Sequence, residues 1–131
     1  MTREAVMSMT DGELRMKAAR LMGWRGLQWN NLSGGGKVWA GDLMGVRTEN
    51  GTGENVPDYP NDIAAAWSLV EINPDWRWAV YELDGGGWCA SPMKVIGVRE
   101  EHNLWDHVGE ASGETAQQAI TRAFILAMEP S

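Results

Sequence analysis

The sequence predicts an α+β domain in which helices pack on an antiparallel sheet. Three observations lead to this fold class. Two segments near the ends of the chain carry helix caps followed by apolar residues at helical spacing. Between them, residues 76–83 alternate like a strand and run into Asp84-Gly85, a hairpin signal that predicts an antiparallel pair. The 131 residues have the size of one domain, so residues 1–131 are expected to form a single domain.

Both terminal helices are expected to begin at a threonine cap. Thr10 and Glu13 form a capping box, and Gly23 stands at the usual C-cap position, so a helix is expected between them. A short helical prelude is expected over residues 2–9. Thr115 begins a second capping box ahead of an alanine-rich stripe. Small alanines allow this last helix to lie close against a sheet.

Residues 24–59 carry weaker signals. A strand is expected over residues 24–29, and one or two short strands over residues 37–46. Residues 30–57 are rich in Gly and Asn, which predicts a long, partly ordered loop region. Loops of this length are uncommon unless they are functional or mobile, so this region is where a family-specific function is expected.

A central helix is expected with Asn61 as its N-cap and a stop before Pro74. Its apolar residues recur at helical spacing, which predicts one buried stripe with Ser68 and Glu71 facing solvent. The positions expected to be buried are Ile63, Ala66, Trp67 and Val70.

The strand over residues 76–83 carries hydrophobic side chains on both faces, with Trp78 and Val80 on one and Tyr81 and Leu83 on the other. This pattern predicts a strand that is covered on both sides. Further strands are expected over residues 88–91, 93–99 and 104–110, with Pro92 at an edge or a bend between the first two.

Eight tryptophans accompany only one Phe and two Tyr. Tryptophan buries a large area with few rotatable bonds, which suits the core of a small domain. On a surface, the same rings would stack on sugars, bases or a partner protein. We expect most of them to lie inside, because apolar side chains usually do.

The net charge of −7 is unevenly distributed. Up to Thr48 the chain has seven basic and four acidic residues, whereas from Glu49 onward it has four basic and fourteen acidic residues. An acidic chain is poorly suited to neutralising phosphates, so direct nucleic-acid binding is disfavoured. The acidic part could instead imitate nucleic acid toward a basic protein, and the alternative is a charge that only keeps the protein soluble. No apolar run is long enough to cross a membrane, and no signal peptide is recognised.

Residues with catalytic or metal-binding chemistry are few. The segment 33–38 lacks the residues of a phosphate-binding loop. His102 and His107 could ligate a metal only from a loop, because a five-residue step puts them on opposite faces of a strand. Cys89 could be a nucleophile beside a histidine, but a buried small hydrophobe is the preferred interpretation. We therefore expect no catalytic residues, no cofactor and no metal, with His102 and His107 as weak metal candidates.

Five segments stand in a characteristic order, and they are Met22-Gly-Trp24, Val56-Pro-Asp-Tyr59, Asp62-Ile-Ala-Ala-Ala-Trp67 with Val70-Glu71, Trp76-Arg-Trp78, and residues 116–127. In this order and spacing they resemble the phage ABA sandwich domain family, small proteins encoded by tailed phages and prophages. Pro60-Asn61 stands where that family typically has Ser-Thr. The resemblance implies a three-layer α/β/α sandwich, a phage origin and the cytoplasm of the infected bacterial host. It implies no activity and no catalytic residues.

The leading hypothesis for function is a non-catalytic phage protein that binds another protein with a basic surface. One form of it is an acidic inhibitor of a host defence or nucleic-acid-handling complex. An alternative is a module that binds a sugar or nucleotide through exposed tryptophans, and a second alternative is a hydrolase or metalloprotein built on Cys89 and the histidines. The candidate partner-binding residues are Trp39, Asp42, Glu49, Glu54, Asp58, Glu100, Glu101 and Asp106.

Overall fold

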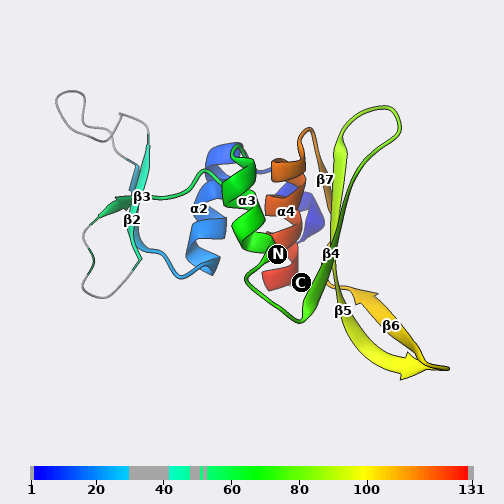
Figure 1. The fold of residues 1–131 in the computed structure, drawn as a ribbon. Helices are drawn as coiled ribbons and strands as arrows, with labels where there is room; N and C mark the ends of the chain where they lie inside the picture. The colour runs from blue at the N-terminus through cyan, green and yellow to red at the C-terminus, as the bar shows by residue number, and fades with distance from the viewer. Residues whose placement is uncertain (1, 30–41, 48–50, 52, 130–131) are drawn as a thin grey trace.

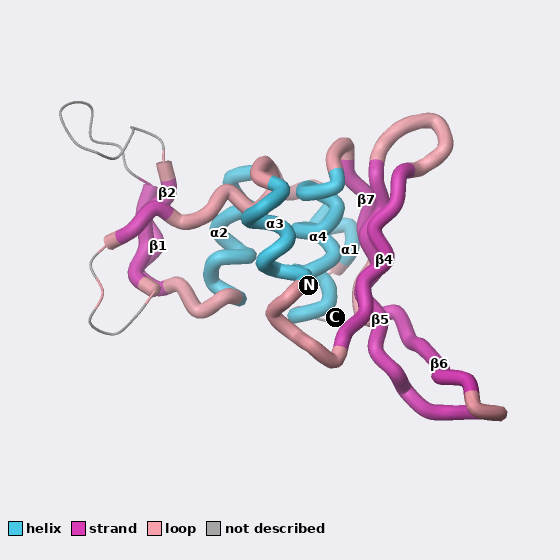
Figure 2. Tube along the Cα trace, viewed as in Figure 1, coloured by secondary structure: helices cyan, strands magenta, loops and turns pink. Residues whose placement is uncertain are grey.

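The computed structural model describes residues 2–29, 42–47, 51 and 53–129. These residues form four helices and two antiparallel sheets, which confirms the α+β class (Figure 1). Figure 2 shows the helices gathered between a small sheet and a larger one. Most of the first half of the predicted loop region lies outside the described residues. None of the described helices is long and apolar enough to cross a membrane.

The two N-terminal helices begin directly after capping threonines. α1 (Arg3–Met7) is the expected prelude, and α2 (Asp11–Leu21) begins behind Thr10. The Thr10 side chain accepts a hydrogen bond from the Glu13 backbone N–H, and the Glu13 carboxylate accepts one from the Thr10 backbone N–H, so the capping box is confirmed. Gly23 follows the helix with a φ of +93°, a conformation that favours glycine at this position.

A small sheet lies beyond α2. It consists of β1 (Arg25–Trp29), β2 (Leu43–Val46) and β3 (Glu54–Asn55) in that order. The Arg15 guanidinium of α2 contacts the Asp42 carboxylate at 2.6 Å and thereby attaches the helix to the start of β2. The strand expected over residues 24–29 is confirmed by β1.

α3 (Ile63–Val70) begins one residue later than expected. Its N-cap is Asp62, whose carboxylate accepts hydrogen bonds from the backbone N–H groups of Ala64 and Ala65. Asn61, the cap predicted from sequence, instead donates its side-chain amide to Asp58 in the preceding turn. The prediction of Asn61 as the N-cap was wrong. Asn61 and Asp62 can both cap a helix, but the Asn61 side chain is already hydrogen-bonded to Asp58 in the turn, so Asp62 caps α3.

The buried face of α3 also differs from the prediction. Ala66 and Leu69 are fully buried on the side that packs against α4. Ile63 and Trp67 are 49% and 48% exposed, so their assignment to the core was wrong. α3 is apolar around most of its circumference, so its sequence contains two overlapping apolar stripes. Only the position of α4 decides which stripe is buried.

The larger sheet contains β4 (Trp76–Glu82), β5 (Trp88–Arg99), β6 (His102–His107) and β7 (Ala111–Gly113). β4 pairs with one edge of β5, and β6 and β7 pair with different stretches of the other edge. All these pairs are antiparallel, and the β4–β5 pair is the one that the hairpin signal predicts.

β5 runs without a break through Pro92, so the prediction of two strands separated there was wrong. Pro92 lies opposite Trp78 of β4, and its carbonyl accepts a hydrogen bond from the Val108 N–H on the other edge. In an antiparallel ladder the N–H and C=O of one residue point to the same neighbour. The N–H that proline lacks would therefore point toward the gap between β6 and β7, where no ladder bond is lost.

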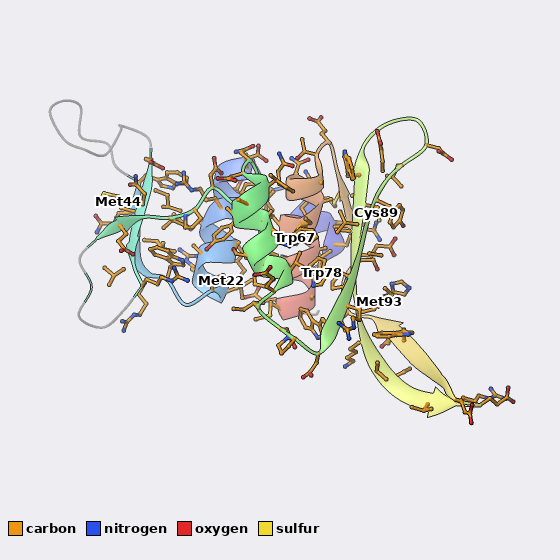
Figure 3. All side chains as sticks on the ribbon, viewed as in Figure 1. Met22, Met44, Trp67, Trp78, Cys89 and Met93 are labelled. Atoms are coloured by element: carbon orange, nitrogen blue, oxygen red, sulfur yellow. The ribbon has the colours of Figure 1, made fainter. Side chains whose placement is uncertain are left out.

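α4 (Ala116–Met128) packs on the larger sheet with one side and on α1, α2 and α3 with the other. Ala119, Ala123 and Ala127 are buried, as the alanine-rich stripe predicts. In Figure 1 the helices lie on one face of this sheet, and Figure 3 shows Trp78 on the helix side of β4. The helix-free face is here called the outer face.

The prediction that β4 is covered on both sides was wrong, because its outer face is exposed. Tyr81, which belongs to this face, is 46% exposed. Aromatic and apolar residues on both faces of β4 predict two covering layers, but no described helix packs on the outer face. The second helical layer of a three-layer sandwich therefore stays a prediction.

The tryptophans are divided between core and surface. Trp24 and Tyr59 are both buried in the same core cluster. Burial raises the pKa of Tyr59 above its ordinary value. Trp76, Trp78 and Trp88 are half-buried, whereas Trp29, Trp67 and Trp105 are exposed, so the expectation of a mainly interior set was wrong for these three. Trp39 lies outside the described residues.

The approach of α4 to the chain between β6 and β7 predicts a strict size limit at Gly109. A Cβ atom there would lie 2.8 Å from the Ala123 carbonyl oxygen and 2.9 Å from the Ala127 nitrogen. Gly109→Ala is therefore expected to lower the free energy of unfolding by roughly 1–3 kcal/mol, the usual range for overpacking. Urea denaturation followed by tryptophan fluorescence measures this change.

Gly12→Ala provides the matched control, because a Cβ atom at Gly12 would meet its nearest neighbours at an ordinary 3.4 Å. Its unfolding free energy is expected to stay within about 1 kcal/mol of the natural chain, since alanine also favours a helix. Equal stability of the two variants would contradict the close packing of α4.

Candidate functional site

A two-stranded arm projects from the end of the larger sheet that is farthest from the β4–β5 hairpin (Figures 1 and 2). β4 begins at Trp76, which pairs with Lys94, and beyond this pair β5 has only β6 beside it. We call residues 95–106 the arm. A two-stranded ribbon is marginally stable alone in water, so the arm depends on its base or on a binding partner for its order.

The arm carries apolar side chains in solvent. Val98 is 69% exposed and Ile96 is 59% exposed, and both belong to β5. Val95 and Trp105 face each other across the two strands and are also exposed. Ile96 lies at a register shift between β5 and β6, which indicates a bulge in the arm. These residues form an apolar surface of the kind that marks a binding site when it is contiguous.

The tip of the arm is acidic and strained. Glu100 and Glu101 occupy the two-residue turn between Arg99 and His102, and their φ angles are +51° and +66°. Asn and Gly are the residues that such a turn favours. Both glutamates are exposed. A left-handed backbone costs roughly 1–2 kcal/mol for each ordinary residue, so a stability argument alone does not explain two glutamates at this turn.

The outer face of the sheet leads from the arm to two polar pairs. The Ser91 hydroxyl and the His107 Nδ1 atom lie 2.6 Å apart, and the Ser91 side chain is buried. Farther along β5, the Cys89 thiol donates to the Glu110 carboxylate at 3.4 Å (Figure 3 marks Cys89). Tyr81 contacts the same thiol from β4. Each polar group is thus bound to a neighbour within the face.

The surroundings of Cys89 do not activate its thiol as a nucleophile. Burial, together with its bond to Glu110, raises the pKa of the Cys89 thiol, so the thiol is protonated at neutral pH. The bond between Tyr81 and Cys89 likewise raises the pKa of the Tyr81 phenol. The histidine nearest in the register, His107, is bound to Ser91 instead of Cys89. The thiol behaves as the buried small residue that was the preferred interpretation.

The two histidines lie at opposite ends of β6. His102 pairs with Arg99 near the tip, and His107 pairs with Met93 near the base. The structure therefore does not bring these two weak metal candidates together. Among the described residues, no group of three or more His, Cys, Asp and Glu side chains is placed to hold a metal ion.

The candidate partner-binding residues lie in several parts of the fold. Glu100, Glu101 and Asp106 are exposed on the arm, and Glu54 is exposed on β3. Asp42 binds Arg15 and the Leu43 N–H, and Asp58 binds Asn61, so both have structural partners. Trp39 and Glu49 lie outside the described residues. Among the candidates that the structure describes, the three acidic residues of the arm are the ones that lie beside the exposed apolar side chains of Val95, Ile96, Val98 and Trp105.

Sequence reasoning missed the most exposed part of this surface. The sequence around Val95, Ile96 and Val98 has the pattern of an ordinary strand. Such a pattern does not reveal that the neighbouring strand β4 begins only at Trp76 and leaves this part of β5 without a partner on that edge. Ser91 and Glu110 were also missed, since neither belongs to a recognised motif. The Glu-Glu pair between two strand signals was the available clue to an unusual turn.

No family model matches the chain, and no curated protein matches it.

The environment of Cys89 predicts that its thiol reacts slowly with disulfide reagents. A disulfide reagent such as DTNB is expected to modify the folded chain at least about tenfold more slowly than the urea-unfolded chain, because only the thiolate reacts and the folded thiol is buried and protonated. Glu110→Gln removes the carboxylate that disfavours the thiolate and is expected to speed the reaction. A folded thiol that reacts as fast as the unfolded one would contradict this description.

Proposed function

We propose that this chain is a non-catalytic protein-interaction protein, and that its arm docks onto a partner protein with a basic surface. The observation that carries this proposal is the pair of highly exposed side chains Ile96 and Val98 on a ribbon that no other described element supports. Burying them against a partner would remove apolar area from water and would add the packing that a two-stranded ribbon lacks.

Charge favours a basic partner. Within the arm, three carboxylates accompany the one guanidinium of Arg99, and the whole chain carries a net charge of −7. Glu100 and Glu101 are held at the farthest point of the arm, where they would meet a partner first. Acidic residues around an apolar centre raise association rates with a basic surface and repel acidic competitors.

The outer face extends this surface toward the rest of the sheet. Val95 and Trp105 of the arm continue the face that holds Tyr81. A partner seated along both would form a layer opposite the helices. The three-layer arrangement implied by the resemblance to phage ABA sandwich proteins would then be completed by the partner. That resemblance also implies a phage origin, and on this basis we favour an acidic inhibitor of a host defence or nucleic-acid-handling complex as the form of the function.

The proposal predicts that binding is lost when the arm loses its apolar side chains. The double change Ile96→Thr and Val98→Thr keeps β-branched residues in the strand but removes apolar surface. The immobilised chain is expected to retain a basic protein from bacterial host extract, and the double variant is expected to retain it at least about tenfold less. Quantitative mass spectrometry of the retained proteins measures the ratio.

Ile72→Thr is the matched control, because Ile72 is also apolar and is 48% exposed, but it follows α3 and lies outside the arm. Its retention of the partner is expected to equal that of the natural chain. Raising the salt from about 0.05 M to about 0.5 M is expected to release the partner, since exposed charges are screened. A partner that is retained by the arm variant, or that is insensitive to salt, refutes the proposal.

A further inference from the structure

A groove of about 530 Å³ lies at the other end of the larger sheet, between the β4–β5 hairpin and α4. The hairpin and the arm extend from opposite ends of β5, so the groove is separate from the docking surface proposed above (Figure 1). Its volume lies in the range of small-molecule sites. The residues that line it are Leu83, Gly86, Gly87, Ser112, Gly113, Glu114, Gln118 and Arg122.

Arg122 is the only cation among the residues that line the groove. Its Nη1 atom donates to the Ser112 carbonyl oxygen at 2.9 Å, which fixes the orientation of the guanidinium. Its Nε atom is buried and has no hydrogen-bond partner. No carboxylate of the described residues forms an ion pair with it. Partly buried cations are normally paired, so a guanidinium held this way favours an anion.

The wall beside Arg122 is already formed. The Gln118 side chain accepts a hydrogen bond from the Glu114 N–H at 2.8 Å and donates one to Asp11 of α2 at 3.1 Å. Gly113 lies against α4 so closely that a Cβ atom would come within 2.8 Å of the Ala119 nitrogen. The groove therefore needs little ordering when a ligand enters it, which lowers the cost of binding.

We propose that this groove binds the carboxylate group of a small molecule, with Arg122 as the anion-binding residue. A planar carboxylate matches the planar fork of a guanidinium. Glu114, an exposed carboxylate on the same groove, repels a doubly charged phosphate more than a singly charged carboxylate. The ligand class is therefore a small monocarboxylate, and inorganic phosphate is the competing chemistry.

The test is an NMR titration of the full ¹⁵N-labelled chain with sodium acetate, sodium phosphate and sodium chloride at equal ionic strength. Acetate is expected to shift the amide signals of Gly86, Gly87 and Gly113 and the Nε–H signal of Arg122, and these shifts are expected to saturate. Arg122→Gln is expected to weaken acetate binding at least about tenfold. Arg20→Gln, which removes an exposed cation on α2, is expected to leave it unchanged.

Acetate shifts that do not saturate, or that persist in Arg122→Gln, overturn the proposal. Tighter binding of phosphate than of acetate overturns the carboxylate assignment. If Arg122→Gln does not fold, Arg122→Lys serves in its place: it keeps the charge but loses the planar fork, and its affinity for acetate is expected to fall severalfold. Unchanged affinity in Arg122→Lys would refute the role of the guanidinium.

Discussion

The contact of α4 with both the sheet and the other helices is the constraint on which the described fold depends. α4 is the element that the larger sheet and the helices α1, α2 and α3 share. Its small residues Ala119, Ala123 and Ala127 are buried, and Gly109 meets its backbone without room for a side chain. Close packing of this kind tolerates few changes in volume. The larger sheet and the helices α1, α2 and α3 are therefore joined through α4.

This arrangement explains why so much apolar surface is exposed. α4 is 13 residues long, and a helix of that length spans about 20 Å. β5 is 12 residues long, and a strand of that length spans about 40 Å. The helix can cover only part of such a strand, so the remainder of β5 extends into solvent as the arm. The outer face is open for a different reason, which is that no described helix packs on that side.

The elements that could be predicted from sequence are those determined by local chemistry. Thr10 and Thr115 cap their helices through hydrogen bonds to residues three positions away, and such bonds are visible in the sequence pattern. The exposed face of α3 could not be predicted, because Trp67 is buried or exposed according to the position of α4. The continuity of β5 through Pro92 also depends on distant residues, namely where β6 ends and β7 begins.

The candidate site likewise has features that the sequence predicts and features that it does not. The acidic residues of the arm were recognised from charge alone, but charge does not distinguish Glu100, at an exposed tip, from Asp42, which is bound to Arg15. The apolar part of the arm was missed because strand patterns report alternation and not whether a neighbouring strand is present. The groove at Arg122 was missed because its lining comes from segments far apart in the chain.

Native-state hydrogen exchange tests the central role of α4 most directly. Amides that open only on global unfolding exchange slowest, whereas weakly supported segments open locally. The central role of α4 predicts that the backbone amides of Ile120–Phe124 exchange at the rate set by global unfolding, and that those of Ile96 and Val98 exchange much faster. Exchange in α4 as fast as in the arm would contradict it, because the helix could then open while the rest of the domain stayed folded.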